Sequence, residues 1–373
     1  MRYYISALLL ILCLAGSSEA QVTFGAPTSV GTGITYYHWR LDGGNSGKTT
    51  FSQLVMPING FVPVKDNFEV LFYAVGSVND LETIGQKTGL TGASDVRLQA
   101  NKSLEDDHLI LSFGLNIPSG KHRLDYNTDT TMLQILSRNY LKFSMRRFGQ
   151  GFGANALIGG ATMLGEFRGG AGILFEYTGD YHPYRGLGKY DPGDFVSFTA
   201  GLDRKQTKGV VYGDVTVTLY TPDRFEDRKT FKQSPEAFFR VGGRYHSGQF
   251  QGDIRFSYLW RGRNTQYDSD ETIEQQFQLF GNEFMAQVDL TKFFGSGWAI
   301  TPSWEIKIIA RNEGIGVNEL GSSHFVGLGA TLAKTLRNGP TLSVGSKYFV
   351  GSANSGAIAI DGIQIFTSAT ATF

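Results

Sequence analysis

Apolar and polar residues alternate along most of this chain with the two-residue period of a half-buried β-strand. In the segment 363–373, Ile363, Ile365 and Phe373 share one parity, and most residues of the other parity are polar. Successive side chains of a strand point to opposite faces, so such a segment predicts a strand with one apolar and one polar face. The same alternation recurs in the segments 94–102, 108–117, 250–261 and 298–311.

The links between the predicted strands alternate between long and short. Long links are expected at 42–49, 77–92, 118–150, 179–193, 221–235, 262–274, 312–320 and 351–357. Short links are expected near 59–66, 103–107, 165–168, 204–208, 247–249, 292–297 and 336–339. Strands of about ten residues joined in this way are typical of outer-membrane barrels, which have short periplasmic turns and long external loops. Both termini then lie on the periplasmic side, and the number of strands is even.

The pattern therefore predicts an all-β fold, a transmembrane antiparallel up-and-down β-barrel of about sixteen strands. The first two strands, near 30–41 and 50–58, have the weakest pattern, so a barrel of about fourteen strands is the alternative. A soluble β-sandwich or propeller would also alternate, but its apolar parity would form a core. Aromatic residues instead gather near predicted strand ends, as in the girdles at membrane interfaces. These residues are Tyr36, Tyr37 and Trp39, Phe72 and Tyr73, Tyr258 and Trp260, and Tyr348 and Phe349.

Residues 1–20 predict a secretory signal peptide, with Arg2 before an apolar run and a small residue, Ala20, at the cleavage site. The apolar run is too short to cross a membrane as a helix. Cys13 raises a lipoprotein alternative, but Leu12 stands where a small residue is expected. We expect residues 21–373 to form one barrel domain in the bacterial outer membrane, without a thiol for a disulfide or a metal.

The composition narrows the function classes. Charged residues make up 18% of the chain, against about 25% in ordinary soluble domains. Lys and Arg together number 34, as do Asp and Glu, so the net charge is zero and gives no reason to expect a nucleic-acid partner. A membrane barrel accommodates this composition because half of each strand faces a polar lumen.

Several short motifs resemble catalytic or binding sites. The segment 42–50 nearly spells a phosphate-binding loop, but a Gly-rich hairpin loop explains it better because no strand–loop–helix unit surrounds it. His246-Ser247 and Ser323-His324 are adjacent pairs that point to opposite faces of a strand, so neither can form a catalytic dyad. The acidic run 268–271 is best explained as a solvated loop. We therefore assign no catalytic, cofactor-binding or metal-ligating residues, expect no cofactor, and predict that the chain is not an enzyme.

From Thr91 onward the chain resembles the outer-membrane barrels of the phenol-degradation meta-pathway family, relatives of the long-chain fatty acid transporter barrels. The resemblance lies in Gly92-Ala-Ser-Asp95-Val96 and in the segment 111–121, where Ser119 replaces the family's threonine before Gly120. The matching segments cover about a tenth of the chain. The resemblance implies the passage of small hydrophobic or aromatic compounds.

We therefore expect a passive outer-membrane channel for such compounds. A structural or adhesin-type barrel and an outer-leaflet lipid-modifying enzyme are the alternatives. Expected partners are outer-membrane lipid and lipopolysaccharide, the barrel-assembly machinery, which would read the terminal aromatic Phe373, and a small apolar solute. The polar parity supplies candidate lumen-lining residues: Arg97, Gln99, Arg240, Arg244, Asp253, Arg255, Glu305 and Lys307.

The loop 118–150 is the candidate gate, because connections of this length are usually functional or disordered. Apolar residues recur at helical spacing in its centre, after Asn127 and Thr128, which could cap a helix. Arg146 and Arg147 follow, and they could anchor the loop to lumen carboxylates or to lipopolysaccharide phosphates. The apolar gate candidates are Met132, Leu133, Leu136 and Tyr140. An external lid that restricts nothing is the alternative.

Overall fold

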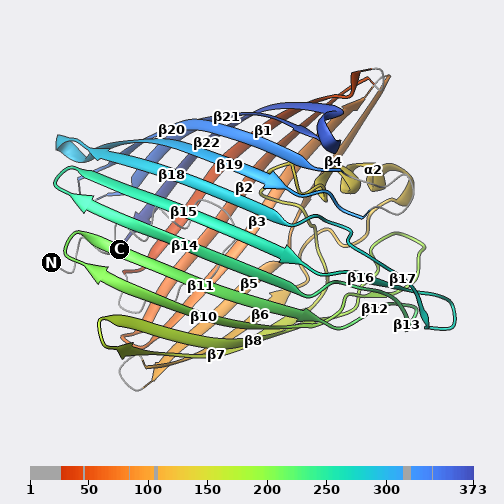
Figure 1. Cartoon of the computed structure of the whole chain (residues 1–373), viewed down its shortest axis with the longest axis horizontal. Coiled ribbons are helices and arrows are strands. Elements are labelled where there is room, and N and C mark those ends of the chain that lie inside the picture. The colour runs from red at the N-terminus through yellow and green to blue at the C-terminus, as the bar shows by residue number, and fades with distance from the viewer. Residues whose placement is uncertain (1–26, 45–46, 84, 105–107, 314–320, 338) are drawn as a thin grey trace.

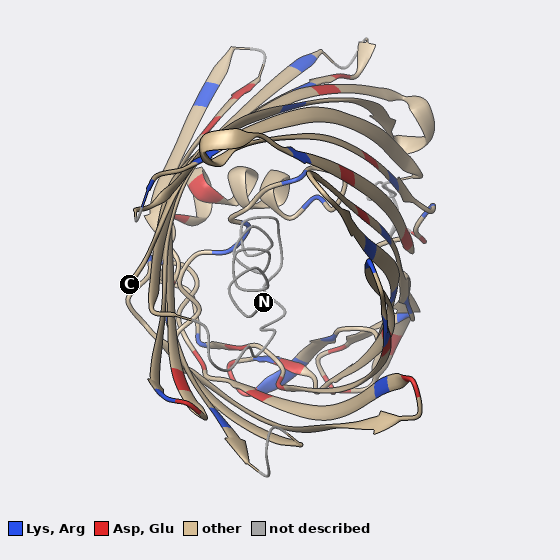
Figure 2. Ribbon diagram, turned by 90° about the vertical axis from the view of Figure 1, so that its left-hand side faces the viewer, with Lys and Arg blue, Asp and Glu red and all other residues tan. Residues whose placement is uncertain are grey.

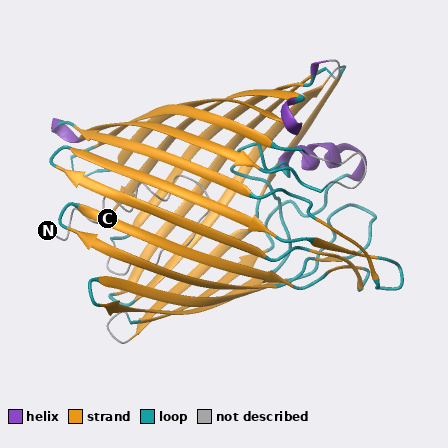
Figure 3. Cartoon of the chain, in the orientation of Figure 1, coloured by secondary structure: helices purple, strands orange, loops and turns teal. Residues whose placement is uncertain are grey.

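The computed structural model describes residues 27–44, 47–83, 85–104, 108–313, 321–337 and 339–373. The predicted signal peptide and Cys13 lie outside the described residues. The chain forms a closed barrel of sixteen antiparallel strands, with a helix and a small extra sheet at one end (Figures 1 and 3). The predicted fold class and strand number are confirmed. No helix in the described part of the chain is long and apolar enough to cross a membrane.

The wall strands follow the chain order. They are β1 (Ser29–Asp42), β2 (Lys48–Lys65), β3 (Phe68–Thr83), β4 (Gln86–Ala93), β5 (Val96–Leu104), β6 (Leu109–Ile117), β7 (Gly153–Leu164), β8 (Phe167–Thr178), β10 (Phe195–Gln206), β11 (Gly209–Tyr220), β14 (Glu236–Ser247), β15 (Phe250–Arg261), β18 (Glu283–Phe293), β19 (Trp298–Ile309), β20 (Ser323–Thr335), β21 (Thr341–Ala353) and β22 (Ile358–Thr372). β4 and β5 together make one wall strand, because β3 pairs first with β4 and then with β5.

The barrel closes between its first and last strands. β1 pairs with β22 from Ser29 opposite Thr372 to Asp42 opposite Ala359. Phe373 follows as a largely exposed residue, and its N–H donates to the Thr28 carbonyl over 2.9 Å. Closure leaves no free sheet edge, so the backbone groups of the wall satisfy one another, as a strand protein in lipid requires.

Short turns lie at the end of the barrel that holds the C-terminus, and the longer connections lie at the other (Figure 1). The longer connections carry the helix α2 (Tyr126–Leu136) and a five-stranded sheet. Two 3-10 turns are η3 (Gly295–Gly297) and η5 (Asn354–Gly356). The strands of the small sheet are β9 (Tyr190–Asp191), β12 (Asp223–Phe225), β13 (Arg228–Lys232), β16 (Asn264–Tyr267) and β17 (Ile273–Phe277).

The two faces of the wall strands differ as the alternation predicts. On β15, Ile254, Phe256, Tyr258 and Trp260 are exposed on the outer face, whereas Asp253 on the opposite parity is buried. The outer face of the barrel is therefore apolar and suited to lipid, and the polar parity faces the lumen.

Two predicted connections are wrong. The expected long link 77–92 is instead the tight end of the β3–β4 hairpin, in which Thr83 pairs with Gln86. The expected turn 59–66 is mostly strand, because β2 continues to Lys65. The polarity pattern failed in the β3–β4 hairpin because Leu81 and Leu90 are buried on the inner face, so apolar residues occupy both faces there.

The segment that resembles a phosphate-binding loop is the β1–β2 hairpin. Asp42 pairs with Lys48, and Gly43 N–H donates to the Gly47 carbonyl over 3.2 Å. The strands on either side are antiparallel, and the hairpin interpretation is confirmed.

The two faces of β10 offer a direct test of the membrane orientation. Phe198 is 44% exposed on the outer face, and its neighbour Thr199 is exposed on the inner one. Phe198→Arg should lower the free energy of unfolding by roughly 2–4 kcal/mol if the position lies near the bilayer centre. Thr199→Arg, the matched control, should change it little because its charge reaches lumen water. Urea unfolding in liposomes measures both, and equal losses would mean that the assigned faces are wrong.

Candidate functional site

The long β6–β7 connection folds into the barrel rather than away from it. Figure 2 shows α2 inside the ring of wall strands. Met132 and Leu136 are fully buried, and Tyr140 is 2% exposed. Leu133 packs against the same apolar cluster from a half-buried position. These four residues were predicted from their helical spacing, although Tyr140 lies beyond the end of the helix.

The cap of α2 differs from the predicted one. Asp125 caps the helix, and its Oδ1 accepts from the N–H groups of Asn127 over 2.9 Å and Thr128 over 3.2 Å. Asn127 and Thr128 are therefore the first-turn donors and not the cap. A carboxylate is the better acceptor here because it also interacts favourably with the positive end of the helix dipole.

The inner face of β1–β4 and β19–β22 supplies the surface on which the loop packs. This half of the wall carries large buried apolar side chains that face inward: Trp39, Phe51, Leu81, Leu90, Phe325 and Phe349. The rings of Trp39 and Phe349 lie 5.1 Å apart, and the Phe51 ring lies 4.5 Å from that of Phe143 in the loop. Aromatic burial of this kind dominates packing energetics, so the loop is held as part of the interior.

Polar contacts fix Ser144 and Met145, in the part of the loop that leads to β7, at one position on this wall. The Tyr37 hydroxyl lies 2.6 Å from Ser144 Oγ. Gln53 Nε2 donates to the Met145 carbonyl over 2.7 Å and to Asn79 Oδ1 over 2.8 Å. Buried amides without partners are costly, so these bonds define one position for the segment rather than a sliding contact.

Both ends of the loop meet at the Asp95 carboxylate. Oδ1 accepts from Gly120 N–H over 2.8 Å, and Oδ2 accepts from Gln150 N–H over 2.6 Å and from Asn116 Nδ2 over 3.1 Å. Asp95 itself is buried. One carboxylate thus closes a loop whose ends lie far apart in the sequence. We name this junction, made of Asp95, Gly120 and Gln150, the loop root.

The loop root explains the motifs that suggested the family resemblance. The wall strand breaks between β4 and β5, where Val96 N–H donates to Ser119 Oγ over 3.0 Å and Lys121 N–H donates to the Ala93 carbonyl over 3.1 Å. At Gly120, an added Cβ would lie 2.7 Å from the Ala93 carbonyl oxygen. Only glycine fits this close approach of two backbones.

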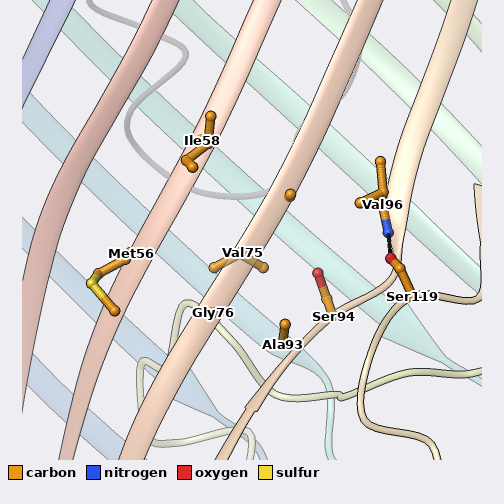
Figure 4. Close-up of a pocket in the computed structure, with 9 residues that line it drawn as sticks. Met56, Ile58, Val75, Gly76, Ala93, Ser94, Val96 and Ser119 are labelled. Carbon is orange, nitrogen blue, oxygen red and sulfur yellow. Dashed lines mark hydrogen bonds between the residues drawn. The ribbon is translucent and has the colours of Figure 1, made fainter.

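Next to the break, the outer face of the barrel has a hollow of about 290 Å³ (Figure 4). Its lining is mainly apolar. The lining residues include Met56, Ile58, Val75, Ala93, Val96 and Ser119. The hollow lies where β4 and β5 are out of register by one residue on β3, with Gly76 opposite Ala93 and Tyr73 opposite Arg97.

Charged side chains also connect the loop to β19 and β21 in the same half of the wall. Glu305 is fully buried, and its two oxygens bind Lys142 of the loop and Lys347 of β21, each over 2.6 Å. About a third of the Lys142 side chain reaches the surface. Burial still lowers the pKa of the Lys142 ammonium group, and the Glu305 carboxylate opposes that shift.

A second cluster holds the segment after α2. Glu283 binds Lys307 over 2.7 Å and Arg261 over 2.8 Å. Asn139 of the loop joins this cluster twice, because its Nδ2 donates to Glu283 over 3.0 Å and its carbonyl accepts from Lys307 over 2.7 Å. Lys142 and Asn139 are therefore the anchors of the loop in this region.

The remaining lumen candidates also lie on the inner parity. Arg240 binds Asp214 over 2.9 Å, Arg244 binds Asp253 over 3.0 Å, and Arg255 bridges Asp253 and Asp289 over 2.9 and 3.2 Å. These residues form a ladder of alternating charge across β11, β14, β15 and β18.

Gln99 and Arg97 lie on β5, away from this ladder. Gln99 Nε2 donates to Asn101 Oδ1 over 2.8 Å. Arg97 is exposed and stands opposite Tyr73. Arg146 and Arg147 are exposed as well, and neither makes an ion pair with a described residue. The structure thus brings Lys142, which the sequence did not single out, to a lumen carboxylate in their place.

A second loop holds the start of α2 at the external mouth. Leu124 N–H donates to the Pro183 carbonyl over 2.9 Å, and Arg185 N–H donates to the Leu124 carbonyl over 2.9 Å. The rings of Tyr126 and Tyr184 lie 5.3 Å apart. Tyr181 packs against Tyr190 nearby, where burial and the Asp223 carboxylate raise the pKa of the Tyr190 hydroxyl. The mouth is therefore lined by aromatic side chains.

One His–Ser contact bears on the enzyme alternative. His38 Nδ1 lies 2.9 Å from Ser52 Oγ across β1 and β2, on the outer parity. The sequence did not reveal this pair, because its members stand 14 residues apart. Among the described residues, no carboxylate is seen to orient the histidine, so the contact lacks the third member of a triad.

No family model matches the chain, and no curated protein matches it. The resemblance to the phenol-degradation family stays a prediction from the residues. Similar solved structures include a bacterial polysaccharide outer-membrane secretin (12% identity, TM-score 0.46, covering 92% of this chain and 98% of the other). They also include the CymD monoaromatic hydrocarbon channel (12%, 0.44, 93% and 88%) and a Pseudomonas aeruginosa FadL homologue (9%, 0.45, 93% and 90%). At these identities and scores, the similarities carry no argument about solute or mechanism.

The loop root can be tested by removing its carboxylate. Asp95→Ala leaves Gly120 N–H and Gln150 N–H without their acceptor, each costing about 1–3 kcal/mol where buried. The loop should then become sensitive to protease in the folded, detergent-purified protein, while the barrel stays intact. Asp203→Ala is the matched control, since Asp203 pairs with Arg168 near the short-turn end. If both variants resist protease like the wild type, Asp95 does not hold the loop.

Proposed function

We propose that this chain is a passive channel of the outer membrane, through which small hydrophobic or aromatic compounds pass. The loop 118–150 narrows its lumen and excludes larger hydrophilic solutes. A single observation carries the proposal. The loop packs on the inner face of one half of a closed barrel, so it occupies space that a pore would otherwise leave open.

The two halves of the lumen support a passage alongside the loop. On one side, the loop buries its apolar residues against β1–β4 and β19–β22. On the other side, β10 and β11 present small hydroxyl side chains such as Thr199, which is exposed inside the barrel. Side chains exposed on an inner face have open space in front of them, which supports a solvated path beside the loop.

The aromatic mouth supports the choice of solute. Tyr181 and Tyr190, then Phe195 and Tyr220, form ring pairs 5.9 and 5.7 Å apart on the β8–β10 side of the barrel. Flat aromatic faces bind apolar and aromatic molecules without demanding one hydrogen-bond pattern. A passive channel needs no cofactor, and the ion-paired wall supplies a rigid frame around the path.

The proposal is tested by removing the constriction and keeping its root. Replacing residues 126–140 with a short Gly-Ser linker deletes α2 but retains Asp95, Gly120 and Gln150. The barrel should still assemble, and its single-channel conductance and its permeability to sugars in liposome swelling should rise several-fold. Both quantities should rise because the deleted side chains, among them Met132, Leu136 and Tyr140, now fill part of the lumen.

A matched control shortens the β16–β17 hairpin at residues 268–272, which lies in the external sheet and not in the barrel wall. Its conductance should match that of the wild type. If the loop deletion assembles and also leaves both quantities unchanged, loop 118–150 restricts nothing. If the wild type and the deletion variant both fail to conduct, a structural or adhesin-type barrel becomes the better explanation.

A further inference from the structure

The loop and the wall beside it carry more cations than carboxylates. The cations are Lys142, Arg146, Arg147, Arg261, Lys307 and Lys347. The carboxylates paired with them are Glu236, Glu283 and Glu305. We name this group of nine side chains the cationic band. Six cations against three carboxylates leave an excess of three positive charges.

The excess follows from how the carboxylates are shared. Glu305 binds both Lys142 and Lys347, so one carboxylate faces two ammonium groups. Arg261 and Lys307 are balanced, because Glu283 binds both and Glu236 also binds Arg261 over 3.1 Å. The Glu305 triad therefore contributes one of the three surplus charges.

Arg146 and Arg147 contribute the other two. Arg146 donates to the Leu141 carbonyl over 3.0 Å, which holds its side chain against the loop without neutralising it. Both side chains are exposed, and among the described residues neither forms an ion pair. Glu176 of β8 lies in electrostatic range of Arg147, but Arg97 lies near the same carboxylate. That neighbourhood adds one charge of each sign. The buried Asp95 carboxylate of the loop root lies near Tyr181, as Arg147 does, and it reduces the net excess around the loop from three to two.

The surplus is local to the loop. The ladder on β11–β18 contains Arg240, Arg244 and Arg255 against Asp214, Asp253 and Asp289, which is an even balance. A solute that passes the loop therefore meets an excess of positive charge where the loop occupies part of the lumen. A narrow channel with low-dielectric walls focuses such a field and concentrates counter-ions.

We propose that the cationic band makes the channel selective for anions and that Arg146 and Arg147 bind the carboxylate of a small organic acid as it passes the loop. This inference rests on the proposed function and adds a charged group to its solute class. Guanidinium groups suit the task because they bind carboxylates through paired, charge-assisted N–H donors. The apolar part of such an acid would meet the aromatic rings at the mouth.

Ion selectivity tests the field. In planar bilayers under a KCl gradient, the reversal potential of the wild type should show chloride permeability several-fold above that of potassium. In the double variant Arg146→Gln/Arg147→Gln, the ratio should fall to about one. The matched control is Arg40→Gln/Arg204→Gln, which removes two arginines that lie on the outer parity in exposed ion pairs. The control should keep the wild-type ratio.

Ligand binding tests the site independently of conduction. Benzoate should bind the detergent-purified wild type more tightly than benzyl alcohol, its neutral counterpart, in calorimetric titrations. The double variant should lose roughly tenfold in benzoate affinity and little in benzyl alcohol affinity, as expected for the loss of charge-assisted hydrogen bonds.

The outcomes separate this inference from the proposed function. A wild type that conducts but prefers potassium, or a double variant with unchanged selectivity and unchanged benzoate affinity, overturns the cationic band as an anion site. If the wild type does not conduct, the channel proposal fails and the binding experiment alone decides. Benzoate binding that the double variant loses then supports the anion site, and absent or equal binding overturns it.

Discussion

A chain that crosses lipid as strands must pair every backbone N–H and C=O with another strand, since the membrane interior offers no water. The rest of this structure depends on that constraint. β1 and β22 satisfy it by closing the wall. At the break between β4 and β5, the loop supplies the missing partners: the Ser119 hydroxyl accepts from Val96 N–H, and Lys121 N–H donates to the Ala93 carbonyl. This interruption of the wall is thus also the place where the loop is fastened. Asp95, which follows β4, accepts hydrogen bonds from both ends of the loop there.

The inner face of the closed wall has an apolar half and a polar half. The loop buries apolar rings against one half, and the other half keeps hydroxyl and charged side chains in contact with lumen water. Glu305 and Glu283 lie at the boundary, where each binds two cations. Breaking such buried pairs would leave an uncompensated charge, which is strongly destabilising. The loop is therefore held by contacts that resist partial release.

The wall was predictable because its period of two is a local property of the sequence, visible in β15 and β19 without knowledge of any partner. The β3–β4 hairpin was not predictable in this way. Leu81 and Leu90 are apolar on the inner face because they belong to the cluster that includes the loop 118–150, which comes later in the sequence. The spacing of Met132 and Leu136 predicted a helix, but the cap proved to be Asp125. The choice of Lys142 over Arg146 as the anchor depends on Glu305, 163 residues away. Only the fold brings these two together.

The central claim is that loop 118–150 lies inside the lumen and controls passage, and thiol labelling of single-cysteine variants during current recording tests it most directly. Cys13, the single cysteine of the sequence, lies in the segment expected to be cleaved, so an introduced cysteine is labelled specifically. The account predicts that a bulky, water-soluble thiol reagent reacts with Arg147→Cys, which is exposed to the lumen, and reduces the current. Met132→Cys, on α2 and buried between the loop and the barrel wall, should not react. Rapid labelling of Met132→Cys, together with an unchanged current in labelled Arg147→Cys, would contradict it.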